Sequence, residues 1–84
     1  MAKTLGTKQH KALIAMLIAK REAAGLTQAE LASALGEYQS FVARLESGER
    51  RVDVIELILL ARLLGFDAPG IVREVEQVGD NPAE

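Results

Sequence analysis

The apolar residues of the chain fall on helical faces, and no segment alternates apolar and polar residues over the length of a strand. Glycines interrupt this pattern at intervals that suit helix ends. They divide it into five predicted helices, at about residues 8–24, 28–35, 39–47, 54–64 and 69–78. We therefore expect an all-α fold, a five-helix bundle in residues 7–78, with flexible ends at residues 1–6 and 79–84.

The residues that flank these segments are of the types that begin and end helices. Thr7 and Asp53 precede the first and fourth segments, where a side-chain oxygen can cap the helix N-terminus. Thr27 precedes the second segment and, with Glu30 three residues later, matches the capping-box pattern. Glycines at positions 25, 36, 48 and 65 follow four of the segments and favour their termination. Pro69 suits the first turn of the fifth helix.

Residues 28–47, the two short helices joined at Gly36, carry the most informative pattern. Four apolar residues suit two helices that pack at a steep angle, namely Leu31, Leu35, Val42 and Leu45. Ala32 is small where the helices would approach most closely, and Gly36 can take the positive φ that a three-residue turn requires. The segment therefore predicts a helix-turn-helix, in which two helices cross at about 90–120°.

The third predicted helix has two contrasting faces. Its inner face carries Phe41, Val42 and Leu45, with Glu46 at the edge. Its outer face carries only small or hydrogen-bonding side chains, namely Gln39, Ser40, Ala43, Arg44 and Ser47. Glutamine can pair with adenine, arginine with guanine, and an alanine methyl can contact a thymine methyl. The alternatives are an ordinary solvated face and a face that reads the major groove of DNA, and its freedom from acidic residues favours the second.

Charge is unevenly distributed along the chain. The net charge of −2 by itself argues against binding to nucleic acid. Residues 1–51, however, hold eight of the ten lysines and arginines and have a net charge of +3, whereas residues 52–84 have a net charge of −5. This asymmetry fits a basic working face and an acidic far end, and random scatter over a solvated surface is the alternative.

Residues 21–65 resemble the helix-turn-helix of the phage Cro and repressor proteins, also called the xenobiotic-response-element family. The resemblance rests on the sequence L-T-Q-A-E-L-A, on the glycine four residues later, and on the following L-E-S-G. The run Q-S-F-V-A-R-L-E-S-G-E-R-R-V-D-V-I-E also resembles a bacterial branch of small stand-alone regulators. The resemblance implies a DNA-binding domain of the phage-repressor type, acting as a transcriptional regulator and repressor.

The resemblance also implies roles for individual positions. Those that face base edges or neighbouring phosphates correspond to Gln39, Ser40 and Arg44, to which the chemistry of the outer face adds Ala43. Those that contact the DNA backbone correspond to Gln28, Arg50 and Arg51. Tyr38 is a further candidate for a phosphate contact, or a lid over the turn. Glu37 departs from the family, in which an aliphatic residue is usual at this position.

Arg21 and Glu46 correspond to a partly buried ion pair in the relatives. Helical wheels independently place both residues beside apolar faces, where an unpaired charge would be unfavourable. We therefore expect the two side chains to form a structural ion pair between the first and third helices.

The small number of cations predicts a homodimer, because one such domain would bind DNA weakly at physiological salt. A two-fold dimer reads two half-sites about 34 Å apart on a pseudo-palindromic operator. One arc of the fourth helix should face the core: Val54, Leu57, Ile58, Leu60, Ala61 and Leu64. Its other side carries a second apolar stripe, Ile55, Leu59 and Leu63, as a candidate dimer surface.

The fifth helix carries its own apolar face, consisting of Ile71, Val72, Val75 and Val78. It either folds over the stripe on the fourth helix within one chain, or these surfaces meet across a two-fold axis. We expect the helix to pack partly within its own chain and to contribute the rest to a dimer. The alternative function is a protein-interaction module, such as an antitoxin or adaptor, which would use the fourth and fifth helices and which the acidic pI favours.

The composition argues against other classes of protein. The chain has no cysteine and a single histidine, His10, so it offers neither a metal site nor an activated nucleophile, and it carries no phosphate-binding glycine loop. We therefore expect no cofactor and no enzymatic activity. The longest apolar run, residues 12–19, is too short to span a membrane. The lack of cysteine fits a cytoplasmic location.

Overall fold

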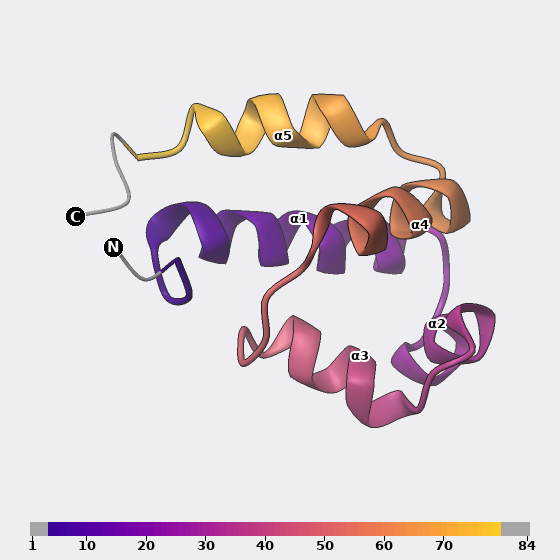
Figure 1. Cartoon of the computed structure of the whole chain (residues 1–84). Helices are drawn as coiled ribbons and strands as arrows, with labels where there is room; N and C mark the ends of the chain where they lie inside the picture. The colour runs from indigo at the N-terminus through magenta and orange to yellow at the C-terminus, as the bar shows by residue number, and fades with distance from the viewer. Residues whose placement is uncertain (1–3, 80–84) are drawn as a thin grey trace.

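The computed structural model describes residues 4–79, which contain five helices and no strand. The helices are α1 (Lys8–Ala23), α2 (Gln28–Leu35), α3 (Gln39–Glu46), α4 (Val54–Leu64) and α5 (Ala68–Glu76) (Figure 1). The expected all-α, five-helix fold is confirmed. Of the segments expected to be flexible, residues 1–3 and 80–84 lie outside the described residues. Residues 4–6 form a turn in which the Thr7 hydroxyl donates to the carbonyl of Thr4 over 2.8 Å.

The predicted limits of α2 and α4 are confirmed because both helices begin with a complete capping box. The Thr27 hydroxyl accepts from the Glu30 backbone N–H over 3.1 Å, and the Glu30 carboxylate accepts from the Thr27 N–H over 2.9 Å. Asp53 and Glu56 repeat this arrangement in α4, over 2.8 and 3.0 Å. Each helix ends at a glycine in the left-handed conformation.

The C-terminal limits of the other three helices differ from the prediction by one or two residues. Helix α1 ends at Ala23, one residue before its predicted end at about residue 24. Helix α3 ends at Glu46 and α5 at Glu76, before the predicted ends at about residues 47 and 78. The N–H of Val78 donates to the carbonyl of Val75 over 3.0 Å, so a tighter turn replaces the last helical residues of α5. Helix α5 also begins one residue early, because Asp67 caps it by accepting from the Gly70 N–H over 3.0 Å.

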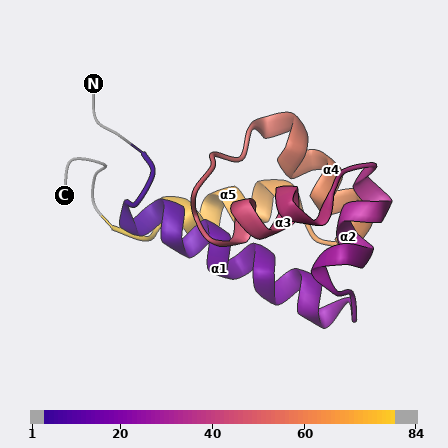
Figure 2. The ribbon, with the colours of Figure 1, turned by 90° about the horizontal axis from the view of Figure 1, so that it is seen from below.

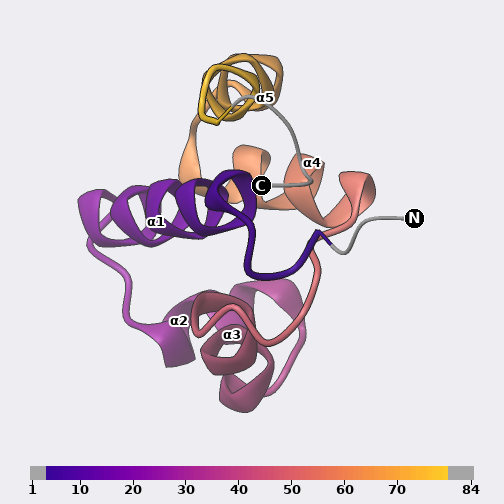
Figure 3. The ribbon, with the colours of Figure 1, turned by 90° about the vertical axis from the view of Figure 1, so that its left-hand side faces the viewer.

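The helices form three layers. Helix α5 lies along one side, α1 and α4 form the middle, and α2 and α3 lie on the opposite side (Figures 1 and 3). Seen from the side of α2 and α3, α3 lies in front of α1 and α5 (Figure 2). The helix-turn-helix therefore occupies one face of the domain, and α5 occupies the face opposite to it.

All five helices contribute to one hydrophobic core. Its buried residues are Ile14, Leu17, Leu31, Ala32, Val42, Leu45, Leu57, Leu60 and Ile71. Burial of each of the larger side chains contributes about 1.5–3 kcal/mol, so this cluster supplies the main driving force for folding. The prediction that Val54 faces the core is wrong, because its side chain is 70% exposed. Val54 is the first residue of α4, and side chains on a helix point back toward its N-terminus, away from the core here.

None of the helices between residues 4 and 79 combines the length and the apolar character that a membrane span requires.

Candidate nucleic-acid interface

Helices α2 and α3 form the predicted helix-turn-helix. Leu31 of α2 and Val42 of α3 are buried between them, and Ala32 is only 1% exposed, which leaves no room there for a larger side chain. Gly36 has a φ of 72°, and the next N–H, that of Glu37, donates to the carbonyl of Ala32 over 2.9 Å. This left-handed residue reverses the chain within a few residues and sets the angle between the helices.

The outer face of α3 is open to solvent. Gln39, Ser40, Arg44 and Ser47 are exposed, and Ala43 is half-buried beneath them. The Arg44 guanidinium lies 4.0 Å from the carboxylate of Glu49, and both side chains are about two-thirds exposed. Because an exposed ion pair of this length contributes little free energy, Arg44 is free to turn toward a ligand.

Tyr38 and Glu37 lie at the turn that leads into α3. The Tyr38 side chain is 84% exposed, so it does not act as a lid over the turn. Glu37, the residue that departs from the family pattern, is also exposed. It borders a small groove of about 70 Å³ whose apolar wall includes Phe41 and Leu59. The carboxylate therefore replaces an aliphatic side chain without being buried itself.

Arg21 of α1 and Glu46 of α3 form a bidentate ion pair. The Arg21 Nε and Nη2 atoms donate to the two carboxylate oxygens over 2.6 and 3.0 Å, and the side chains are only 12% and 7% exposed. The third nitrogen, Nη1, donates to the carbonyl of Leu26 over 2.7 Å. The hydrogen bonds with Glu46 raise the pKa of the Arg21 guanidinium, while burial acts in the opposite direction. Arg21 is therefore held positively charged beside the core.

A chain of hydrogen bonds connects this ion pair to the outer face of α3. Gln28 Nε2 donates to Glu46 Oε1 over 2.9 Å, and Gln39 Nε2 donates to Gln28 Oε1 over 2.8 Å. Gln28 and Gln39 are the first residues of α2 and α3, so these hydrogen bonds connect the starts of both helices to the buried ion pair. The sequence predicted the ion pair but gave no indication of the two glutamine hydrogen bonds, which join residues 18 and 11 positions apart.

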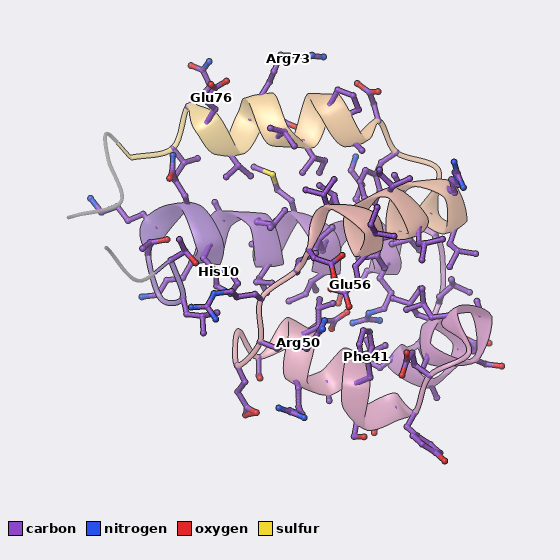
Figure 4. All side chains as sticks on the ribbon, viewed as in Figure 1. His10, Phe41, Arg50, Glu56, Arg73 and Glu76 are labelled. Carbon is purple, nitrogen blue, oxygen red and sulfur yellow. The ribbon has the colours of Figure 1, made fainter. Side chains whose placement is uncertain are left out.

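Arg50 is engaged by neighbouring side chains rather than free in its loop. Its Nη1 and Nη2 atoms donate to the two carboxylate oxygens of Glu56 over 3.1 and 2.9 Å. The guanidinium carbon also lies 4.4 Å from the centre of the Phe41 ring, in cation–π geometry. Figure 4 shows the three side chains together, between α3 and the start of α4. Arg51, the next residue, is exposed.

The apolar stripe on α4 is uncovered. Ile55, Leu59 and Leu63 are 66%, 43% and 42% exposed. Helix α5 packs instead against α1, with Ile71 buried and Val75 partly buried. Of the two arrangements that the sequence left open, folding of α5 over this stripe within the chain is therefore wrong.

The remaining polar residues form no second site. Within residues 4–79, no three metal-binding side chains lie together. His10, expected to be solvated, is half-buried, and its Nε2 atom is buried without a hydrogen-bond partner among the described residues. It lines two grooves beside the start of α1, where the other polar side chains include Lys11, Glu46 and Ser47 in one and Thr7 and Arg51 in the other.

A tight helix-turn-helix whose second helix presents an exposed polar face defines a DNA-binding helix-turn-helix protein. Comparisons with known proteins agree, because a helix-turn-helix family model matches residues 17–71. One solved structure, an XRE-family like protein from Pseudomonas syringae pv. tomato str. DC3000, is 44% identical and superimposes with a TM-score of 0.74. The match covers 81% of this chain and 83% of that one. No curated protein matches. The chain belongs to the XRE family of Cro/repressor-type helix-turn-helix proteins.

Proposed function

We propose that this protein is a sequence-specific transcriptional repressor that binds a pseudo-palindromic operator as a homodimer and acts in the cytoplasm. The observation that carries the proposal is the outer face of α3, which is exposed and free of acidic residues. Hydrogen bonds from Gln28 to Glu46 and from Gln39 to Gln28 hold both ends of this helix. A helix held in this way on the rim of a compact domain fits the major groove. Family membership supports a binding role and not a catalytic one.

The base contacts come from the outer face of α3, namely from Gln39, Ser40, Ala43 and Arg44. Arg44 pairs with a guanine, because its guanidinium is held only by a long, exposed ion pair. Gln39 donates one N–H to Gln28, which leaves its carbonyl oxygen and second N–H for an adenine. The half-buried Ala43 leaves space for a thymine methyl between the longer side chains.

The phosphate contacts come from the border of this face. Gln28 opens α2, Tyr38 precedes α3 and is almost fully exposed, and Arg51 is an exposed cation in the following loop. Such contacts set the register of the protein on the duplex but do not choose its sequence. Arg50, the fourth candidate from the sequence, differs because Glu56 and Phe41 already engage its guanidinium.

Dimerisation through the stripe of Ile55, Leu59 and Leu63 supplies the affinity that one domain lacks. Exposed apolar residues in a row on one helix are typical of a contact surface. Helix α5, whose Arg73 and Glu76 side chains point away from the domain, lies on the side opposite α2 and α3 (Figures 3 and 4). The acidic residues of α5, Glu74 and Glu76, therefore lie on the side of the domain away from the DNA phosphates.

Selection of bound sequences from a random duplex pool tests this proposal. The expected result is a two-fold symmetric sequence whose half-sites lie about one helical turn apart, with binding that weakens steeply as salt increases. Failure to enrich any sequence at low salt would contradict the proposal.

The exposed stripe also supports a second candidate function, an antitoxin or adaptor that binds another protein through α4 and α5. In that case a specific protein would co-purify with the chain, and substitutions in the stripe would release it. Co-purification of a specific protein, together with a lack of salt-dependent binding to DNA, would favour this second function over the first.

A further inference from the structure

Arg50 lies in the loop between α3 and α4, and its side chain contacts the first turn of each helix. Its guanidinium makes two hydrogen bonds to the Glu56 carboxylate, over 3.1 and 2.9 Å, and lies over the Phe41 ring of α3 at 4.4 Å. The Arg50 and Glu56 side chains are only 28% and 23% exposed. Figure 4 shows these three side chains directed toward one another.

Glu56 has two partners at once. Its Oε1 atom accepts from Arg50 Nη1 over 3.1 Å and from the backbone N–H of Asp53 over 3.0 Å. The second of these bonds belongs to the capping box that fixes the start of α4. Arg50 therefore connects a residue of α3, Phe41, to the residue that sets the start of α4.

This connection matters because α3 packs mainly against α2 and α1 and its backbone stays largely apart from that of α4. The orientation of α3 relative to α4 therefore depends on side chains that bridge the two helices. In a dimer formed through α4, this orientation also sets the distance between the two recognition helices. A bidentate arginine stacked on an aromatic ring fixes such an orientation more firmly than a lysine can.

We propose that Arg50 is a positioning residue that fixes the recognition helix α3 relative to α4, and that Arg51 alone provides the phosphate contact of this loop. The assignment rests on the proposed function. To reach a phosphate, Arg50 would have to leave a carboxylate and a ring that it contacts in the free protein. Arg51 is exposed and has no ion pair among the described residues.

Four single variants separate the two roles: Arg50→Ala, Arg50→Lys, Glu56→Gln and Arg51→Ala. Glutamine at position 56 retains the capping box but removes the carboxylate charge, so it isolates the interaction with Arg50. Lysine at position 50 retains the positive charge but does not reproduce the bidentate, stacked geometry. Each variant is measured for melting temperature and for affinity to the enriched duplex and to a shuffled duplex, over a range of salt concentrations.

A positioning role predicts that Arg50→Ala, Arg50→Lys and Glu56→Gln each lower the melting temperature and reduce, several-fold, the preference for the enriched duplex over the shuffled one. The slope of log K against log salt stays at the parental value in all three. Arg51→Ala leaves the melting temperature unchanged and makes this negative slope shallower, by about 0.9 for each phosphate that the variant no longer neutralises.

A shallower salt slope in Arg50→Ala, parental behaviour of Arg50→Lys, or tighter binding by Glu56→Gln would each show that Arg50 is a phosphate ligand and would overturn the assignment. If the parent protein binds neither duplex, the proposed function fails. The interaction between Arg50 and Glu56 is then still judged by the melting temperatures, which would be unaffected by all three variants if it had no positioning role.

Discussion

The ion pair between Arg21 and Glu46 is the residue-scale feature on which the position of the outer face of α3 depends. It is almost fully buried, and Glu46 also accepts the hydrogen bond from Gln28 that leads to Gln39. The raised pKa of Arg21 keeps its charge in place, and the stability that this shift provides is lost only as the pH rises through that raised value. Arg21 therefore stays positively charged, and available to pair with Glu46, throughout the neutral pH range.

Arg21→Met should lower the free energy of unfolding by about 3–5 kcal/mol, because it leaves the Glu46 carboxylate buried without its partner. Chemical denaturation measures this loss. Arg44→Met is the matched control, since it breaks the exposed pair with Glu49 and should change the free energy of unfolding by less than about 0.5 kcal/mol. Equal effects of the two substitutions would show that the pair of Arg21 and Glu46 is solvated.

Part of the site at the residue scale could be predicted from the sequence. The helical period alone places Gln39, Ser40 and Arg44 on the outer face of α3, and all three are exposed there. The engagement of Arg50 could not be predicted, because the resemblance suggested a free cation in a loop. Whether such an arginine meets Glu56 or solvent depends on the path of the loop, which the periodic pattern does not determine.

At the scale of the secondary-structure elements, the turn between α2 and α3 determines whether α3 can enter a groove. Ala32 is fully buried at the closest approach of the two helices, and Gly36 supplies the left-handed residue. The limits of α2 and α4 followed directly from the sequence, since a capping box and a glycine depend on neighbouring residues only. The end of α5 did not, because the chain there has no glycine before Gly79 to end the helix.

Ala32→Leu should force α2 and α3 apart, lower the free energy of unfolding by about 1–3 kcal/mol and abolish DNA binding. Ala34→Leu, an exposed position of the same helix, should leave both properties near the parental values. Thermal unfolding and binding to a labelled duplex measure the two effects. Retention of binding by Ala32→Leu would mean that the angle between the helices is not needed for recognition.

At the scale of the whole molecule, the three layers place the proposed DNA-binding and dimer surfaces on different helices. Helices α2 and α3 lie on one side, α5 on the other, and α4, whose Ile55, Leu59 and Leu63 are exposed, between them (Figure 1). The sequence showed that α4 has two apolar sides but not which surface α5 would cover. The sequence pattern does not distinguish which of several apolar faces α5 covers, because these faces are similar in length. The structure distinguishes them, because Ile71 of α5 packs into the core.

Leu59→Glu should yield a folded monomer with weaker binding to the operator, because Leu59 lies in the middle of the exposed stripe and makes up little of the core. Sedimentation equilibrium measures the change in mass, and circular dichroism verifies the fold. Val72→Glu is the matched control, since Val72 is 53% exposed on α5, outside the stripe. A parent that is already monomeric on its operator would contradict dimerisation through α4.

The most direct test of the central claim, that the outer face of α3 reads base edges, is the binding of Arg44→Ala to a panel of single base-pair variants of the enriched duplex. Removal of a bidentate pairing should cost about 1–3 kcal/mol of discrimination and should flatten the preference at one position in each half-site. Preferences at the other positions should persist. An unchanged preference at every position would show that Arg44 does not read a base and would contradict the account.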